Sequence, residues 1–512
     1  MTRTQKSLKN TVFSFSLQLV TLVFNFAIKT VIVKRLGIEY SGITTLFSDV
    51  LAILSLAELG FGTATGYALY RPLHENDEQQ VSTLIHYYRK IYVVIAGVIL
   101  AVGLGVMPFI HKIVKNAPNI KESIAFIFFL YVIKTATSYL FIYKATLLDA
   151  NQENNVVSKV SMISTIAASL VEFFVLVFTE EYLLYLAVMI FFVLAKNVAV
   201  SLVADTKFPF LKKVKPKPLK SEEKHEIKRN VGALAIYKVC GTMQKSVDSI
   251  IISSFLGTAQ VGFLANYRLL SDHVDTLFGQ FMIETRSSIG NLAVSESRER
   301  QFGVYCRLCM LAFLIGNFIA VSLLVLVNPF IALWLGKSYL LGLEIPVVLA
   351  ADLYIISMTR PTENFRIANS LFVQGKYRPV YMTVINIVLS LIFCKFWGIF
   401  GVLFATVLAR LSTHVWYDPW LINKHVFHRS FPKYLVVKVL AAVLVGVNGF
   451  VTCFLASKIE TGNPWLDFLI KGCLCAVVPN ALAVLTVCRT SEFKELLASA
   501  KRLVLKKAGR KG

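Results

Sequence analysis

The stretch VDSIIISSFLGTAQVGFLANYRLL (247–270) joins two apolar runs through a Leu-Gly turn at 256–257, with a second glycine five residues further on. An earlier stretch, TVIVKRLGIEYSG (30–42), has the same arrangement, a Leu-Gly pair at 36–37 followed by a glycine five residues later. Glycine suits sharp turns because it tolerates a positive φ. The two stretches are related by a shift of 220 residues, which predicts two copies of one helical unit. The glycines expected to mark the equivalent turns are Gly37, Gly42, Gly257 and Gly262.

The composition predicts an all-α integral membrane protein. Of the 512 residues 56% are hydrophobic and only 16% are charged, whereas a soluble domain carries about a quarter charged residues. A mostly apolar run of about 18 residues or more can cross the bilayer as a helix. Fourteen such spans are expected, at 11–33, 43–70, 88–110, 122–148, 156–179, 182–205, 231–256, 260–289, 303–327, 343–373, 379–396, 399–423, 434–457 and 465–488.

The basic residues predict the orientation of these spans. Fourteen spans place both termini on one side of the membrane. With the N-terminus inside, the tails and the inner connections, counted with the first residues of the adjoining spans, hold about 31 Lys and Arg residues and the outer connections about 7. Basic loops mark the cytoplasmic side, so we expect a multi-pass protein of the inner membrane with both termini cytoplasmic. The net charge of +23 then reflects these loops, and nucleic acid is not an expected partner.

A Pro- and Lys-rich segment divides the chain into two six-helix units. KFPFLKKVKPKPLKSEEKHEIKRN (207–230) has the composition of a solvated linker. Six spans precede it and six follow it. An even number of helices per unit makes the two copies parallel and relates them by a pseudo-two-fold axis along the membrane normal. The expected organisation is an N-terminal bundle (1–206), a basic cytoplasmic linker (207–230), a C-terminal bundle (231–430), two additional spans (431–490) and a basic cytoplasmic tail (491–512).

Ionisable residues inside the spans are the candidate functional residues, because charges at membrane depth are costly and usually face a protein interior or an aqueous cavity. Lys238, Gly241, Lys245 and Asp248 have spacings of 3, 4 and 3, which place them on one face of a helix. A second stripe starts at Arg268, which can pair with a carboxylate four residues later. Its other members are Asp272, Asp275 and Gly279.

Two interpretations of these charges remain open. They could be buried ion pairs that fix helix packing, or they could line a polar cavity between the two bundles. We favour the cavity, and because basic residues outnumber acids at mid-membrane it should attract an anionic cargo. The residues expected to contact cargo are Lys29, Lys134, Lys238, Lys245, Arg268, Arg360 and Arg410, with Asp248, Asp272, Asp275 and Pro361 expected in coupling or gating.

No pattern in the sequence indicates catalysis or a cofactor. The chain has no GxxxxGK[ST], HExxH or GxSxG motif, and its outer connections are short. The eight cysteines lie in apolar runs. CRLC (306–309) lacks the second cluster that a zinc site needs. We therefore expect a protein that is not an enzyme and that holds no metal and no cofactor.

Three stretches resemble a known family of transporters. They are IKRNVGALAIYKVCGTMQKSVDSIIISSFLGTAQVGFLANYRLL (227–270), FRIANSLFVQGKYRPVYMTVINIVLSLIF (365–393) and GIFGVLFATVLARLSTHVWYDPWLINKHVF (398–427). They are similar to the polysaccharide-export flippases, the O-antigen and capsule repeat-unit translocases of the multidrug/oligosaccharidyl-lipid/polysaccharide exporter superfamily. The resemblance implies two six-helix bundles around a central cavity, with two added C-terminal helices.

The resemblance also implies an activity. Such proteins move an undecaprenyl-diphosphate-linked oligosaccharide to the outer leaflet, and basic lumen residues contact the cargo. Membrane lipid, a polysaccharide polymerase and glycosyltransferases are the other expected partners. Carried over by position, the resemblance implies roles for Asp248, Gly257, Gly262, Arg268, Arg366, Gly375 and Pro379, with Arg366 meeting the cargo at entry.

Two other functions fit the sequence less well. A cation-coupled multidrug exporter of the same architecture is the main alternative, but its cavity should be acidic or apolar, because typical drugs there are cations. A membrane glycan polymerase needs a sizeable outer loop, and the longest outer connections, about 111–121 and 328–342, are short.

Overall fold

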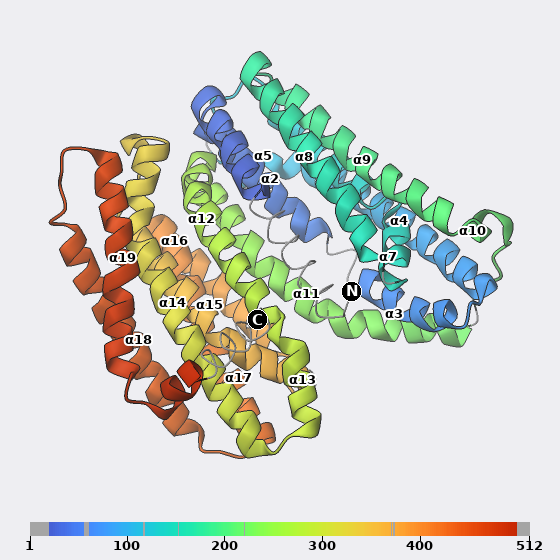
Figure 1. Cartoon of the computed structure of the whole chain (residues 1–512). Coiled ribbons are helices and arrows are strands. Elements are labelled where there is room, and N and C mark those ends of the chain that lie inside the picture. The colour runs from blue at the N-terminus through green and yellow to red at the C-terminus, as the bar shows by residue number, and fades with distance from the viewer. Residues whose placement is uncertain are drawn as a thin grey trace, which may run out of the picture. The chain divides into compact units, whose positions relative to one another are not determined.

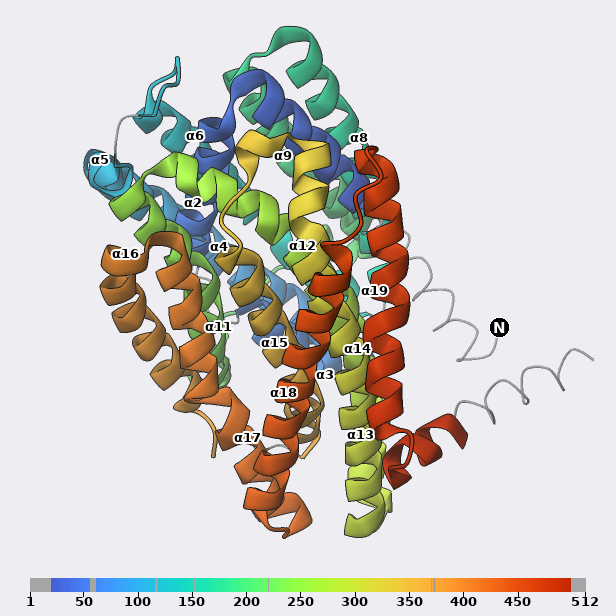
Figure 2. The ribbon, with the colours of Figure 1, turned by 90° about the vertical axis from the view of Figure 1, so that its left-hand side faces the viewer.

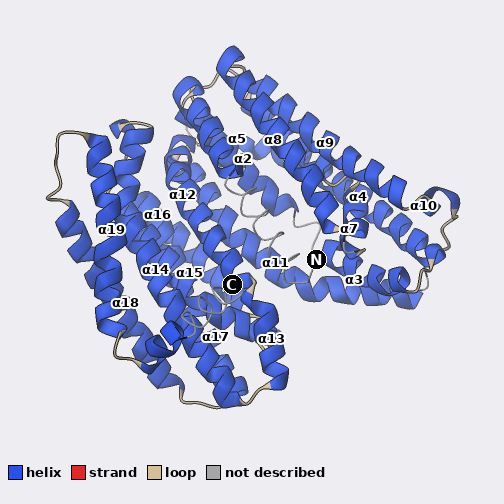
Figure 3. Cartoon of the chain, viewed as in Figure 1, coloured by secondary structure: helices blue, strands red, loops and turns tan. Residues whose placement is uncertain are grey.

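The computed structural model describes residues 20–498 except 56–60, 116–117, 152, 220, 370 and 372–373. All regular secondary structure in this part of the chain is helical (Figure 3), which confirms the all-α prediction. The chain divides into two compact units, residues 1–262 (unit 1) and 263–512 (unit 2). The predicted borders of the bundles, linker and tail remain a prediction.

The described part of unit 1 begins within a helix at residue 20 and ends in the first residues of α12 (Figure 1). Residues 20–31 are helical and continue into a π-helical turn. Long helices then alternate with short turns, and α12 begins at Thr258 and continues into unit 2. The elements are η1 (Ile32–Leu36), α2 (Ile38–Leu54), α3 (Phe61–His74), α4 (Glu78–Val106), η3 (Met107–Phe109), α5 (Ile110–Ile113), α6 (Ile124–Ser138), α7 (Ile142–Ala150), α8 (Asn154–Thr179), α9 (Tyr182–Lys207), α10 (Phe210–Lys213), α11 (Ser221–Leu256) and α12 (Thr258–Ile283).

Unit 2 is built around α14, which contacts α15, α18 and α19. Figure 2 shows α18 and α19 as the two C-terminal helices beside α14. The elements are α13 (Thr285–Ser295), α14 (Arg298–Trp334), η4 (Lys337–Tyr339), α15 (Glu344–Ala368), α16 (Arg378–Leu411), α17 (His414–Ile422), η5 (Asn423–Phe427), α18 (Phe431–Ala456) and α19 (Pro464–Val487).

Eight segments of the described chain are long and apolar enough to cross a membrane. They are Glu78–Ile113, Ile124–Ala150, Asn155–Thr179, Tyr182–Lys207, Arg298–Trp334, Arg378–Phe427, Tyr434–Ala456 and Pro464–Val487. The helices α2, α11, α12 and α15 occupy other predicted spans. Of these, α11, α12 and α15 carry many of the predicted intramembrane charges. The fold is that of a multi-pass, all-helical membrane protein, and an architecture of about fourteen helices is consistent with it.

The segment Arg378–Phe427 contains a helical hairpin, as the two predicted spans 379–396 and 399–423 require. Gly398 has φ 58° and ψ −134°, which is outside the helical range. The Asn386 side chain donates a hydrogen bond to the Thr406 hydroxyl at 2.9 Å. In a straight helix these residues would be about 30 Å apart, so the chain must reverse between them. A glycine serves at the reversal because other residues rarely adopt this conformation.

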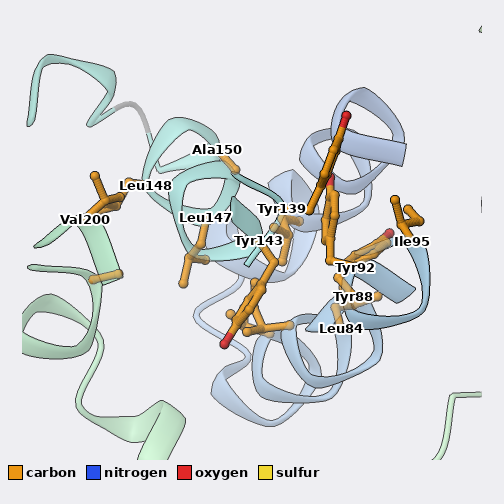
Figure 4. Close-up of a cluster of buried hydrophobic side chains, with 14 of the residues drawn as sticks. Leu84, Tyr88, Tyr92, Ile95, Tyr139, Tyr143, Leu147, Leu148, Ala150 and Val200 are labelled. Carbon is orange, nitrogen blue, oxygen red and sulfur yellow. The ribbon is translucent and has the colours of Figure 1, made fainter. Parts of the chain in front are cut away.

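Aromatic side chains fill much of the apolar core of unit 1. In one cluster Tyr88 and Tyr92 of α4 are almost completely buried, and Tyr139 and Tyr143 are buried beside them (Figure 4). The rings of Tyr92 and Tyr139 stack with their centroids 6.5 Å apart. Large amphipathic rings bury much apolar area each, so this cluster fixes α4 against the segment that contains α7.

The predicted solvated linker is partly attached to unit 1. The Gln79 side chain donates to the Lys215 carbonyl at 2.7 Å, and the Ser82 hydroxyl donates to the Val214 carbonyl at 3.0 Å. Phe208 and Leu219 are buried in the same aromatic cluster. The residues that follow, from Ser221, already belong to α11.

Candidate functional site

The repeated glycines form a reciprocal contact inside unit 1. Gly37 (φ 113°) and Gly257 (φ 99°) are the turn residues with positive φ, whereas Gly42 and Gly262 lie within the first turns of α2 and α12. A Cβ on Gly42 would overlap the carbonyl oxygen of Thr258, and one on Gly262 would overlap that of Ile38.

This contact has the symmetry of the sequence repeat. The pair Gly42 and Ile38 is related to the pair Gly262 and Thr258 by the same shift of 220 residues. Gly42 of α2 therefore packs on the backbone of Thr258 in α12, and Gly262 of α12 packs on the backbone of Ile38 in α2. The sequence repeat predicts turns at all four glycines. Two of them instead serve a close helix–helix approach, which only a residue without a Cβ permits.

The predicted stripe on α11 is not uniform. Lys238, Gly241 and Lys245 are exposed, as expected for one open face. Asp248, near the C-terminal end of the same helix, is only 1% exposed. The spacing places all four residues on one face of α11. The first three positions are nevertheless exposed, whereas the carboxylate of Asp248 is buried.

Lys134 of α6 lies beside a network of hydroxyl groups in unit 1. Its ammonium is 5.4 Å from the centroid of the Tyr131 ring, and Glu172 of α8 is the nearby opposite charge. The Tyr131 and Tyr182 hydroxyls are 3.2 Å apart, and the Tyr182 hydroxyl is 2.8 Å from that of Thr44. The network was not expected, although Tyr131 precedes Lys134 by one helical turn and could have suggested it.

Lys29 is the remaining predicted basic residue of unit 1. It is half-buried in the helix before η1. Neither Lys29 nor Lys245 takes part in an ion pair within the described residues of unit 1, where the paired lysines are Lys144, Lys207 and Lys212. These two predicted residues therefore have no carboxylate within ion-pair distance among the described residues.

In unit 2 the α12 stripe meets Arg360 of α15. The Arg360 guanidinium pairs with the Asp275 carboxylate and also donates to the Asp275 carbonyl at 3.1 Å. A Cβ on Gly279 would lie 2.8 Å from the guanidinium, so the glycine makes room for it. Of the other stripe members, Arg268 is half-buried and Asp272 exposed. Pro361, the next residue after Arg360, is buried, and α15 continues through it.

Arg410 of α16 also has a carboxylate partner. Its Nε is 2.6 Å from Oδ1 of Asp352 on α15, and both side chains are about one fifth exposed. Asp352 was not among the predicted site residues. This pair ties α15 to the second arm of the hairpin.

A third cluster surrounds Asp418 of α17, which was also not predicted. Arg366 lies 3.6 Å from the carboxylate, Arg378 lies 3.3 Å from it and His414 3.8 Å. Asp418, Arg366 and Arg378 are at most 7% exposed. One carboxylate thus lies close to two buried guanidinium groups, one from α15 and one from α16.

The packing interpretation of the membrane charges applies to three arginines of unit 2. Arg360, Arg366 and Arg410 of unit 2 are each neutralised at least in part by a carboxylate, as the packing interpretation expects. Lys29, Lys134 and Lys245 make no carboxylate contact of salt-bridge length among the described residues. Their role in binding stays a prediction, as does that of Lys238, Arg268 and the coupling residues.

Sequence comparisons give no match: neither protein-family models nor curated proteins match the chain. Solved structures do match. The lipid II flippase MurJ, in an inward closed conformation, matches with a TM-score of 0.65 and 16% identity over 93% of this chain and 98% of its own. An inward-facing multidrug resistance MATE family transporter of the MOP superfamily matches with a TM-score of 0.61 and 14% identity. That alignment covers 78% of this chain and 93% of the transporter.

A mutant of the Vibrio cholerae MATE transporter VcmN gives a TM-score of 0.52 at 12% identity, over 83% of this chain and 99% of its own. These identities are too low to transfer a substrate, but the alignments cover nearly the whole of each neighbour. The chain therefore has the fold shared by these MATE transporters and the MurJ flippase.

Proposed function

We propose that the protein is a flippase that moves an undecaprenyl-diphosphate-linked oligosaccharide from the inner to the outer leaflet of the cytoplasmic membrane, for the assembly of a surface polysaccharide. The observation that carries the proposal is the set of basic side chains in the membrane helices of unit 1. Lys29 and Lys245 have no carboxylate partner among the described residues of that unit. Charges at membrane depth are retained for function, and an excess of positive charge suits a diphosphate.

The extent of the structural match supports a lipid substrate over a drug. The MurJ alignment leaves only about 36 residues of this chain unmatched, too few to hold both α18 and α19. The alignment with the MATE transporter leaves about 113 residues unmatched. The two C-terminal helices thus align at least in part with a protein described as a lipid II flippase.

The paired arginines change which residues we expect to contact the cargo. A guanidinium that already binds a carboxylate has fewer free donors for a diphosphate. We therefore expect Lys29, Lys134 and Lys245 to bind the headgroup. Arg360 and Arg410 should instead stabilise the packing of helices in unit 2. Glycosyltransferases and a polymerase would act before and after this step.

A multidrug exporter is the second candidate, because the transporters of that class share the fold. Depleting the protein in cells that produce it separates the two functions. Depletion of a flippase should make lipid-linked oligosaccharide accumulate and the surface glycan disappear, with drug sensitivity unchanged. Increased sensitivity to cationic drugs with a normal surface glycan would overturn the proposal and favour the exporter.

A further inference from the structure

Unit 2 contains a cavity of about 450 Å³, a size within the usual range for ligand sites. Its walls come from α14, α15, α16, α17 and α18 and are almost entirely apolar. Along α18 the lining residues include Lys438, Ala442, Val445, Gly446 and Gly449, whose helical spacing forms one stripe about 17 Å long.

The cavity opens as a groove toward the outside of the unit. Val347, Leu411 and Val439 line it and are between 43% and 55% exposed. In a membrane-spanning unit such exposed apolar side chains meet lipid chains. An elongated apolar ligand could therefore lie in the groove and still be continuous with the bilayer.

One charge lies at an end of this stripe. Lys438 is the charged residue among the described residues that line the cavity, and its ammonium lies 5.3 Å from the centroid of the Tyr434 ring. It is four residues from the start of the membrane span at Tyr434, about 6 Å along the helix. A lysine stem can extend that far toward the interface. Tyr354 and Tyr434 add two hydroxyl groups to the same lining.

We propose that this groove binds an anionic glycerophospholipid, with one acyl chain along α18 and its phosphate on Lys438. The apolar walls suit the chain. The lysine and the tyrosine hydroxyls are the donors that a phosphate needs. Because the groove is open along its rim, the second acyl chain remains in the bilayer.

The chain offers a matched pair of glycines to test the site. Gly446 of α18 lines the groove, and Gly472 of α19 is not among its lining residues. A Cβ on either would meet no atom within 4 Å. Gly446→Phe should therefore fill the groove without a backbone clash, and Gly472→Phe should add the same ring elsewhere.

The experiment measures lipids retained by the purified full-length chain, using native mass spectrometry with added phosphatidylglycerol or phosphatidylcholine of equal chain length. Wild type should retain phosphatidylglycerol preferentially. Lys438→Gln should lower the apparent affinity for it about tenfold, as expected for loss of one charge-assisted hydrogen bond, and Lys438→Arg should keep it. Gly446→Phe should lose the bound lipid because its ring fills the groove. Ala442→Leu, which adds a smaller side chain to the same groove, should also lose it. Gly472→Phe should retain the lipid.

Three results would overturn the inference. One is equal retention of the two lipids by wild type, and another is equal retention of phosphatidylglycerol by Gly446→Phe and Gly472→Phe. The third is displacement of phosphatidylglycerol by a polyprenyl phosphate at equal concentration, which would assign the groove to a transported lipid.

Discussion

Asp418 lies beside two buried arginines, so the stability of unit 2 should depend on its carboxylate. Its carboxylate lies within 3.6 Å of both Arg366 and Arg378. Removing the shared partner of buried charges costs about 3–5 kcal/mol. We predict that Asp418→Asn lowers the melting temperature and the yield of folded protein.

The control for Asp418 is another carboxylate that binds an arginine. Glu495 lies 3.2 Å from Arg307, but its side chain is 58% exposed. An exposed pair contributes at most about 1 kcal/mol, so Glu495→Gln should leave the melting temperature nearly unchanged. Equal melting temperatures for the two variants would show that the Asp418 cluster does not stabilise the fold.

The Arg410 and Asp352 pair separates a packing role from a cargo role. Reversing either charge alone places two like charges together and should reduce the folded yield. The double reversal, Arg410→Asp with Asp352→Arg, restores the opposite charges. If Arg410 acts only through its 2.6 Å contact with Asp352, the double variant should recover both the yield and transport.

A double variant that folds but does not transport would contradict this account of Arg410. It would show that the guanidinium itself meets the cargo, as the sequence prediction had it. Measuring the yield by fluorescence-detected size exclusion and the transport by surface glycan keeps the two effects apart.

Sequence reasoning identified Arg360, Arg410 and Asp275 as membrane charges but could not pair them. Asp275 and Arg360 are 85 residues apart in the chain, and no local pattern links them. Asp418 was missed for a similar reason, because its arginine partners lie on α15 and α16. A charged residue inside an apolar span can be recognised from the sequence. Its partner cannot, because the partner depends on how the helices pack.

At the scale of elements, the repeated glycine contact sets how closely α2 and the start of α12 approach. We predict that Gly42→Ala and Gly262→Ala each destabilise the protein, because the added methyl overlaps a backbone carbonyl. Overpacking of this kind costs about 1–3 kcal/mol. Thermal unfolding in detergent measures it.

Gly97→Ala in α4 is the matched control, since a Cβ there meets nothing within 4 Å. A helical Gly→Ala change without a clash is neutral or slightly stabilising. Because Gly42 and Gly262 share one contact, their double variant should cost less than the sum of the single ones. Melting temperatures of the Gly42 and Gly262 variants at or above that of Gly97→Ala would contradict the contact.

The elements themselves were largely predictable, because apolar run length is a strong signal. The differences arise where the backbone changes locally. The predicted span 122–148 is divided between α6 and α7, with Phe141 at φ 69°, and the span 260–289 between α12 and α13. An apolar run continues through such breaks, so composition alone does not show them. The predicted span 43–70 includes residues 56–60, which lie outside the described residues.

At the scale of the whole molecule, composition and charge distribution were sufficient for the class of fold. A chain that is 56% hydrophobic must place its helices in lipid, and the structural neighbours are transporters of that kind. Substrate choice is different, because it depends on which charges are left without partners. The ion pairs of unit 2 show that a count of basic residues overestimates the charge available to a cargo.

The proposed function requires that lysines of unit 1 bind the diphosphate of a lipid-linked oligosaccharide during its movement between leaflets. The most direct test reconstitutes the purified chain in vesicles with a fluorescent lipid diphosphate oligosaccharide and follows its accessibility to an impermeant quencher. Wild type and Lys395→Gln, which changes an exposed lysine of α16, should move the lipid. Lys29→Gln and Lys134→Gln should slow it about tenfold or more, as expected for loss of a charge-assisted contact. Equal rates in all four proteins, or no movement by wild type, would contradict the claim.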